Sequence, residues 1–230
     1  MLTCGGRKLA SVTDIALVIF DCDGVLIDSE LLSAQVLLEE LADAGVKIDL
    51  PYFFRNCLGR HFAAVVDRIG RDTGQALGDD FERQFRSRLL ERFERELEPI
   101  AGAREVLTRL RIPFCVATSS STERAARSLD LAGLSGLVGG RLVSSTMVAR
   151  GKPSPDLFLL AAERHKLPAS QCLVIEDSEM GIEAARAAKM PVWRFTGGSH
   201  FGAGYREMVD CMPADREFGE MSDFLRLLKG

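Results

Sequence analysis

Three short apolar runs, each followed at once by a polar residue, constrain the fold of this chain most. They cover residues 15–20, followed by Asp21; residues 112–117, followed by Thr118; and residues 172–175, followed by Glu176. Their hydrophobicity is continuous rather than alternating, which is typical of strands buried on both faces of a parallel sheet. The runs therefore predict parallel strands with polar side chains just beyond their carboxyl ends.

Helical patterns alternate with these runs. Apolar spacing predicts helices over residues 101–110, 155–165 and 180–189. A further strand is expected at 191–195 and a short edge strand at 209–212. Because strands that alternate with helices are typical of a doubly wound sheet, the predicted fold class is α/β, with a Rossmann-like three-layer core around a parallel sheet.

Residues 29–97 interrupt this alternation. The segment 29–44 has helical spacing, and Gly45 is well placed to end that helix. In the highly charged segment 81–97, apolar residues recur at every fourth position: Phe81, Phe85, Leu89, Phe93 and Leu97. This spacing predicts an amphipathic helix with one buried stripe, and its charges are interpreted as a solvated face. We therefore expect an all-helical insert after the first strand.

The length of 230 residues fits one core with a sizeable insertion. We expect a loose N-terminal leader at residues 1–13, an α/β core made of residues 14–28 and 98–230, and a helical cap at residues 29–97. The chain has 29 basic and 33 acidic residues, a net charge of −4, so it offers no basic surplus for a nucleic acid. No apolar run approaches the roughly 20 residues of a membrane span.

The cysteines and the N-terminus point to the compartment. None of the six cysteines forms a CxxC pair, and the three histidines lie far apart, so the spacing of a zinc site is absent. Cys115 and Cys172 lie in strand-like runs, where a thiol packs as a small apolar group. The N-terminus lacks the apolar middle of a secretory signal. Free thiols in such a chain favour the reducing cytoplasm.

Two carboxylates, Asp21 and Asp23, follow the first apolar run. Ligands and catalytic groups collect at the carboxyl ends of strands in open α/β sheets. Two carboxylates one residue apart are costly at such a place unless a cation or a catalytic task explains them. The pattern favours a functional site, with a helix cap and turn as the alternative. Gly24 then permits a tight turn.

The sequence DxDGVLxDS that begins at Asp21 resembles the first motif of the haloacid dehalogenase superfamily, and its other motifs follow in order. Residues 118–121 (TSSS) resemble the second motif, 151–156 (GKPSPD) the third and 176–181 (EDSEMG) the fourth. The helical insert resembles the small cap of the β-phosphoglucomutase-like branch. Within this branch the chain most resembles sugar-phosphate phosphatases such as 6-phosphogluconate phosphatases.

This resemblance implies a phosphatase that hydrolyses small phosphate monoesters through an aspartyl-phosphate. Asp21 would be the nucleophile. Asp23 would be the general acid and base, and we expect the neighbouring carboxylates to raise its pKa. The implied cofactor is Mg²⁺, which prefers oxygen ligands. Its implied ligands are Asp21, the backbone carbonyl of Asp23 and Asp177, with Glu176 as an additional or outer ligand.

A cation and several hydroxyls complete the implied catalytic site. Lys152 would contact both the nucleophile and a phosphate oxygen, although a surface lysine is the alternative. The Thr118 hydroxyl and the Ser119 amide would bind phosphate if a helix begins at Ser119, and Thr118 could also be a plain helix cap. Ser120 and Ser121 are expected to be capping residues rather than ligands.

Substrate choice must depend on the cap, because the core recognises only the phosphoryl group. Arg60 and His61 lie where members of this branch carry a specificity loop, and Arg60 could bind a second anionic group. Ordinary surface positions are the alternative for both. Ser33 stands where the mutases carry a histidine, which weakens the β-phosphoglucomutase-like alternative.

Two other functions are disfavoured by the motifs. Dehalogenases of this superfamily lack the acid found here at Asp23, and a non-catalytic binding module would tolerate losses in the motifs, of which none is visible. We therefore expect a cytoplasmic, monomeric enzyme that acts on a small phosphorylated metabolite, with neither nucleic acid nor membrane as a partner.

Overall fold

A computed structural model describes residues 14–78, 80–208 and 213–229. The leader expected at residues 1–13 and the edge strand expected at residues 209–212 lie outside these residues. No helix in the described residues is long and apolar enough to cross a membrane.

Six parallel strands form one sheet in the order β3-β2-β1-β4-β5-β6. Their bounds are β1 Leu17–Phe20, β2 Phe114–Thr118, β3 Leu142–Ser144, β4 Cys172–Glu176, β5 Val192–Phe195 and β6 Arg216–Phe218. Central β1 pairs with both β2 and β4, so that Ile19 lies opposite Cys115 and Val174. The strand order reverses at β1, which places the loops after β1, β2 and β4 where ligands bind in open α/β sheets.

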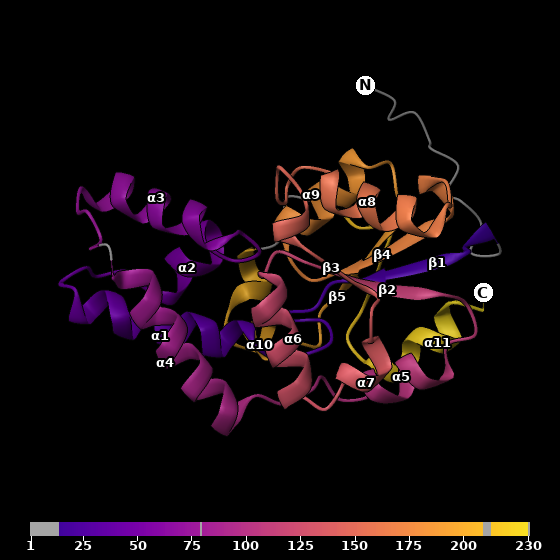
Figure 1. The fold of residues 1–230 in the computed structure, drawn as a ribbon, viewed down its shortest axis with the longest axis horizontal. Helices are drawn as coiled ribbons and strands as arrows, with labels where there is room; N and C mark the ends of the chain where they lie inside the picture. The colour runs from indigo at the N-terminus through magenta and orange to yellow at the C-terminus, as the bar shows by residue number, and fades with distance from the viewer. Residues whose placement is uncertain (1–13, 79, 209–212, 230) are drawn as a thin grey trace.

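Helices cover both faces of this sheet and confirm the predicted α/β fold (Figure 1). Helices α8 (Asp156–His165) and α9 (Glu179–Ala187) lie on one face, where Leu17 and Ile19 of β1 pack. On the other face, Val18 and Phe20 belong to the core that includes residues of α5 (Ala103–Arg109), α6 (Thr122–Leu131), α7 (Ser135–Val138) and α11 (Phe224–Leu227). The short α10 (Ser199–Gly202) follows β5. Successive residues of β1 therefore point to opposite layers, both buried.

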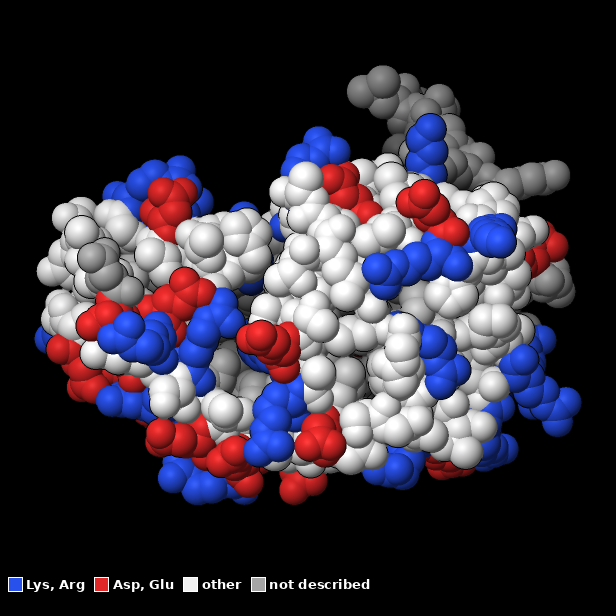
Figure 2. Space-filling view, in the orientation of Figure 1, with Lys and Arg blue, Asp and Glu red and all other residues white. Residues whose placement is uncertain are grey.

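The helical insert, whose helices lie between residues 30 and 96, is beside the carboxyl ends of the strands, at the left of Figure 1. Its helices are α1 Glu30–Asp43, α2 Leu50–Asn56, α3 Phe62–Thr73 and α4 Phe81–Glu96. In α4 the predicted stripe is buried, including Phe85 and Leu89, while acidic and basic side chains intermingle on the outer surface of the insert (Figure 2). The predicted amphipathic helix is thereby confirmed.

The two ends of the insert lie side by side on the core. The backbone amide of Asp28 donates to the carbonyl of Glu98 at 2.9 Å, and the amide of Ile100 donates to the carbonyl of Leu26, also at 2.9 Å. The chain therefore leaves the sheet for the insert and returns to it through two adjacent, hydrogen-bonded segments.

Candidate active site

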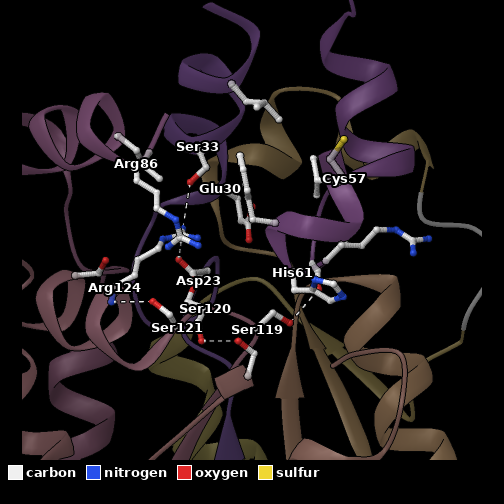
Figure 3. Close-up of a pocket in the computed structure, with 18 of the residues that line it drawn as sticks. Asp23, Glu30, Ser33, Cys57, His61, Arg86, Ser119, Ser120, Ser121 and Arg124 are labelled. Carbon is white, nitrogen blue, oxygen red and sulfur yellow. Dashed lines mark hydrogen bonds and ion pairs between the residues drawn. The ribbon is translucent and has the colours of Figure 1, made fainter. Parts of the chain in front are cut away.

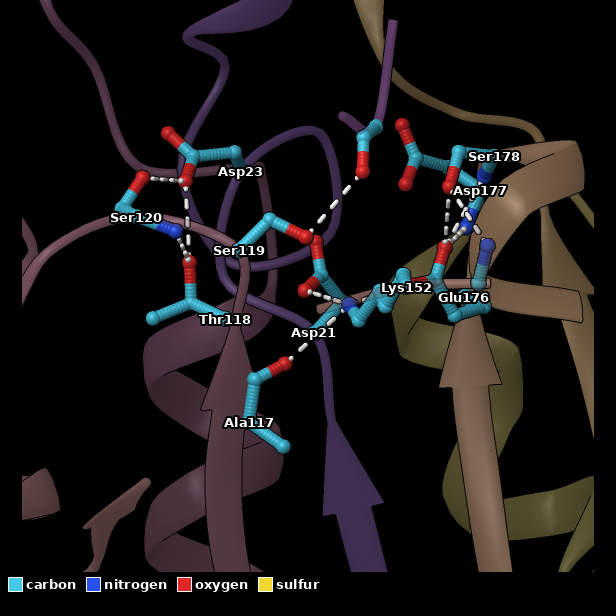
Figure 4. Close-up of polar contacts among 12 residues, drawn as sticks. Asp21, Asp23, Ala117, Thr118, Ser119, Ser120, Lys152, Glu176, Asp177 and Ser178 are labelled. Carbon is cyan, nitrogen blue, oxygen red and sulfur yellow. Dashed lines mark hydrogen bonds and ion pairs between the residues drawn. The ribbon is translucent and has the colours of Figure 1, made fainter. Parts of the chain in front are cut away.

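The carboxyl ends of three neighbouring strands bring the sequence motifs together (Figure 4). Asp21 follows β1, Thr118 ends β2, and Glu176 ends β4. Lys152 reaches the same point from the loop before α8. Because the strands are parallel and adjacent, residues far apart in the sequence converge as predicted.

Lys152 lies at the centre of a buried network. Its Nζ is 2.5 Å from Oδ1 of Asp21 and 2.5 Å from Oε1 of Glu176, and it donates to the carbonyl of Ala117 at 3.2 Å. The residue is only 5% exposed, so the surface-lysine alternative is wrong. Burial alone would lower the pKa of Lys152, but the two carboxylates raise it above its usual value. The side chain is therefore a fixed positive charge beside Asp21.

Asp21, Glu176 and Asp177 form an acidic cluster in which one ligand atom of each lies within 4.8 Å of the others. Burial raises the pKa of Asp21, and Lys152 only partly offsets this effect. Burial and the neighbouring Glu176 likewise raise the pKa of Asp177. A cation held between these oxygens would remove much of the cost of burying them as carboxylates.

The oxygens of this cluster differ in how they are already engaged. Oε1 of Glu176 contacts Lys152, while Oε2 accepts from the amides of Asp177 and Ser178 at 2.9 Å and from the Ser178 hydroxyl at 3.0 Å. Oδ2 of Asp177, by contrast, is buried and makes no hydrogen bond of regular geometry to any described residue, although Nε2 of His200 lies 3.0 Å away. Asp21 and Asp177 thus offer the oxygen donors that suit Mg²⁺, and Glu176 already holds the loop after β4 in place.

Asp23 accepts hydrogen bonds on both carboxylate oxygens. Oδ1 accepts from the Ser29 hydroxyl at 2.7 Å and from Nη2 of Arg124 at 3.1 Å. Oδ2 accepts from the hydroxyls of Ser120 at 2.8 Å and Thr118 at 3.2 Å. Burial would raise the pKa of Asp23, but Arg124 and the three hydroxyls outweigh burial, and the pKa lies below its usual value. The predicted rise in this pKa is therefore wrong for the protein without substrate.

The hydroxyls after β2 are used differently from the prediction. Helix α6 begins at Thr122, so the Ser119 amide is not at a helix start. Ser121 caps α6, as predicted, by accepting from the Arg124 amide at 3.3 Å. Ser120 instead donates its hydroxyl to Asp23. The Ser119 hydroxyl donates to the Gly59 carbonyl at 3.0 Å, which connects this loop to the helical insert.

A cavity of about 540 Å³ lies between the strand ends and the insert. Asp21, Asp23 and Lys152 line it from the core, and Arg60 and His61 line it from the insert. Apolar side chains form much of the remaining wall: Leu37, Phe53, Val65, Phe85, Leu89 and Phe93. The cavity thus joins the predicted catalytic residues to the predicted specificity loop.

Sequence reasoning missed several charged residues that also line this cavity, among them Glu30, Arg86 and Arg124 (Figure 3). Arg124 extends from α6 to Asp23, and its Nη2 lies 3.5 Å from the Ser33 hydroxyl in the insert. Burial raises the pKa of Glu30, and Asp177 and Asp23 add to this effect. Glu30 could have been predicted as a site residue, because it directly follows the first motif, at the start of α1.

Comparisons with known proteins find relatives of this chain in sequence and in fold. A family model described as haloacid dehalogenase-like hydrolase matches residues 15–189. A 6-phosphogluconate phosphatase of Escherichia coli is 27% identical to this chain, and the match covers 81% of this chain and 85% of that protein. A fructose-1-phosphate phosphatase of the same species is 32% identical, and the match covers 75% of this chain and 92% of that protein. A haloacid dehalogenase-like protein from Agrobacterium tumefaciens is structurally similar with a TM-score of 0.77, at 30% identity, covering 94% of this chain and 98% of that one.

Proposed function

Because this chain belongs to the haloacid dehalogenase-like hydrolases and is a phosphatase, we propose that it hydrolyses sugar or sugar-acid phosphates in a Mg²⁺-dependent reaction with Asp21 as the nucleophile. The observation that carries this proposal is the buried contact of 2.5 Å between Lys152 Nζ and Asp21 Oδ1. A carboxylate that attacks a phosphate dianion needs a positive charge next to it, and Lys152 supplies that charge.

The reaction has two steps. First, an Asp21 oxygen forms a bond to phosphorus while the bond from phosphorus to the sugar oxygen breaks, and Asp23 gives its proton to that oxygen. Asp23 then takes a proton from the water that hydrolyses the aspartyl-phosphate. A phosphate dianion beside Asp23 would raise its pKa, so that substrate binding itself favours the protonated form that the first step requires.

Asp21 and Asp177 are the side chains that would hold Mg²⁺, together with the backbone carbonyl of Asp23. When bound, the ion would offset charge on the phosphoryl group. Two observations support this assignment: ligand oxygens of Asp21 and Asp177 lie within 4.8 Å of each other, and Lys152 already pairs with Asp21 in the same buried cluster. We assign Glu176 to holding Lys152 and the loop after β4, since its oxygens are already engaged.

Thr118 and Ser119 are proposed to bind the phosphoryl group. Ser119 lines the cavity, and the Thr118 hydroxyl lies 3.2 Å from Asp23, next to the place where the leaving oxygen must be protonated. Each hydroxyl can donate to a phosphate oxygen when it releases its present partner.

Residues 14–28 and 98–230 are proposed to form the catalytic core, and residues 29–97 a cap that selects the substrate. The insert supplies much of the cavity wall beyond the strand ends, and core residues such as Arg124 and Arg127 of α6 supply another part of it. Arg60, His61 and Arg86 line the insert's side of the cavity, which favours a substrate with a second anionic or polar end. The two Escherichia coli relatives, named for 6-phosphogluconate and fructose-1-phosphate, support this substrate class.

The test is phosphate release from a panel of sugar and sugar-acid phosphates, with Mg²⁺ and with EDTA. We expect release that requires Mg²⁺ and needs no added bisphosphate, with Asp21→Asn protein as the control for contaminating phosphatases. Isomerised sugar phosphate formed only after addition of a bisphosphate would instead establish a mutase. Full activity in EDTA would contradict the metal requirement.

A further inference from the structure

His200 lies against the acidic cluster in a position that the proposed reaction does not explain. The residue is fully buried in α10, and its Nε2 is 3.0 Å from Oδ2 of Asp177. Neither of these two atoms makes a hydrogen bond of regular geometry to any described residue. Buried polar groups of native proteins are nearly always hydrogen-bonded, so this close pair requires an explanation.

The chain is shaped to bring the imidazole and the carboxylate together. A Cβ atom on Gly24 would lie 2.1 Å from Oδ2 of Asp177 and 3.1 Å from Cε1 of His200. A Cβ atom on Gly198 would lie 2.6 Å from Cε1 of the same ring. Glycine at both positions therefore permits the close approach of His200 to Asp177.

Aromatic neighbours fix the plane of the His200 ring. Its centroid lies 4.6 Å from that of Phe201 and 5.3 Å from that of Tyr205. The ring therefore has little freedom to turn away from Asp177. His200 does not belong to the cluster of Asp21, Glu176 and Asp177 that could hold the ion, so it contacts that cluster from outside.

We propose that His200 is a positioning residue that orients the Asp177 carboxylate for metal binding, an inference that rests on the proposed Mg²⁺ site. A neutral imidazole with its proton on Nε2 can donate to Oδ2 after a small rotation of the carboxylate. That hydrogen bond directs the second carboxylate oxygen toward Asp21. Partners of this kind fix the orientation of metal ligands, and their loss typically weakens metal binding by about 10- to 100-fold.

The experiment is calorimetric titration of the full chain with Mg²⁺, comparing wild type with His200→Phe and His200→Gln. His200→Phe removes the donor and keeps a ring, so we expect Mg²⁺ affinity to fall about 10- to 100-fold. His200→Gln places an amide donor near the position of Nε2, and we expect it to restore most of the affinity. His200→Met removes the donor in a flexible side chain and replaces His200→Phe if that variant does not fold. His165→Gln is the control, because His165 contacts the Ala161 carbonyl in α8 and should leave Mg²⁺ affinity unchanged.

The outcomes separate this inference from the proposed function. Wild-type affinity in the variants without a donor would overturn the inference, as would an equal loss in His200→Phe and His200→Gln, which would show that His200 acts only through packing. Asp177→Asn is measured alongside. If wild type does not bind Mg²⁺, or if Asp177→Asn binds it as well as wild type does, the proposed metal site itself is wrong and the inference falls with it.

Discussion

The charged residues at the strand ends are buried, whereas those on the outer surface of the helical insert are exposed; Glu40, which pairs with Arg88, is a buried exception in the insert. At the strand ends, Lys152 and its partners Asp21 and Glu176 are 5%, 6% and 0% exposed. In the insert, the pair of Arg71 and Asp67 joins side chains that are 68% and 65% exposed. Buried charges must fix one another's positions, because an unpaired one would be very costly. Exposed charges carry no such constraint, so the insert can vary where the core cannot.

The largest expected effect is at the nucleophile of the core. Asp21→Asn keeps the shape of the side chain and removes the attacking charge, so phosphate release should fall by several orders of magnitude. Lys152 keeps its partner Glu176 in this variant, and the fold should persist. Turnover assays with circular dichroism as the folding control test both statements. Near-normal turnover would show that the covalent step does not use Asp21.

A second prediction sets a buried charge against an exposed one. Lys152→Met leaves Asp21 and Glu176 buried without their cation, so the free energy of unfolding should fall by about 3–5 kcal/mol. Arg71→Ala removes an exposed partner and should change it little, because surface ion pairs are largely screened. Urea denaturation of both variants measures the difference. Equal effects would mean that burial does not separate the two regions as described.

The smallest effect is expected in the insert and should depend on the substrate. Arg60→Ala should lower kcat/KM about 10- to 100-fold for the best sugar-acid phosphate, the size of a lost charged hydrogen bond of about 1.5–3 kcal/mol. p-Nitrophenyl phosphate has no second anion and should be affected far less. Parallel kinetics on the two substrates test this: equal losses would assign Arg60 to the structure of the insert, and no loss on either would make it a surface residue.

The layers of the fold and the convergence of the motifs were predictable from the sequence. Continuous apolar runs identified β1, β2 and β4, and polar residues after parallel strands must meet at one edge. Strands β3 and β6 were missed because three residues each are too few to show a pattern. Short elements of this kind are stabilised by their neighbours in the sheet rather than by their own sequence.

The partners of the site residues were far less predictable. Arg124 lies 101 residues from Asp23, and nothing in its local sequence indicates that it faces a carboxylate. The predicted pKa of Asp23 had the wrong direction because only neighbouring carboxylates were visible in the sequence. The contact of His200 with Asp177 was equally unpredictable, since it depends on how α10 packs against the loop after β4.

The adjacent ends of the insert have a consequence for how such enzymes diversify. Asp28 and Glu98 are joined by one backbone hydrogen bond, so the chain leaves and re-enters the core at adjacent points. The core therefore does not depend on the particular segment that lies between these two points. The entropic cost of bringing the two ends of a connecting segment together rises slowly with the length of the segment, by about 0.6 kcal/mol for each doubling. A whole segment of different size could therefore be exchanged at this junction while Asp21 and Lys152 keep their positions relative to each other. New substrates could then arise by recombination of a single contiguous stretch of gene, without a search through individual point mutations.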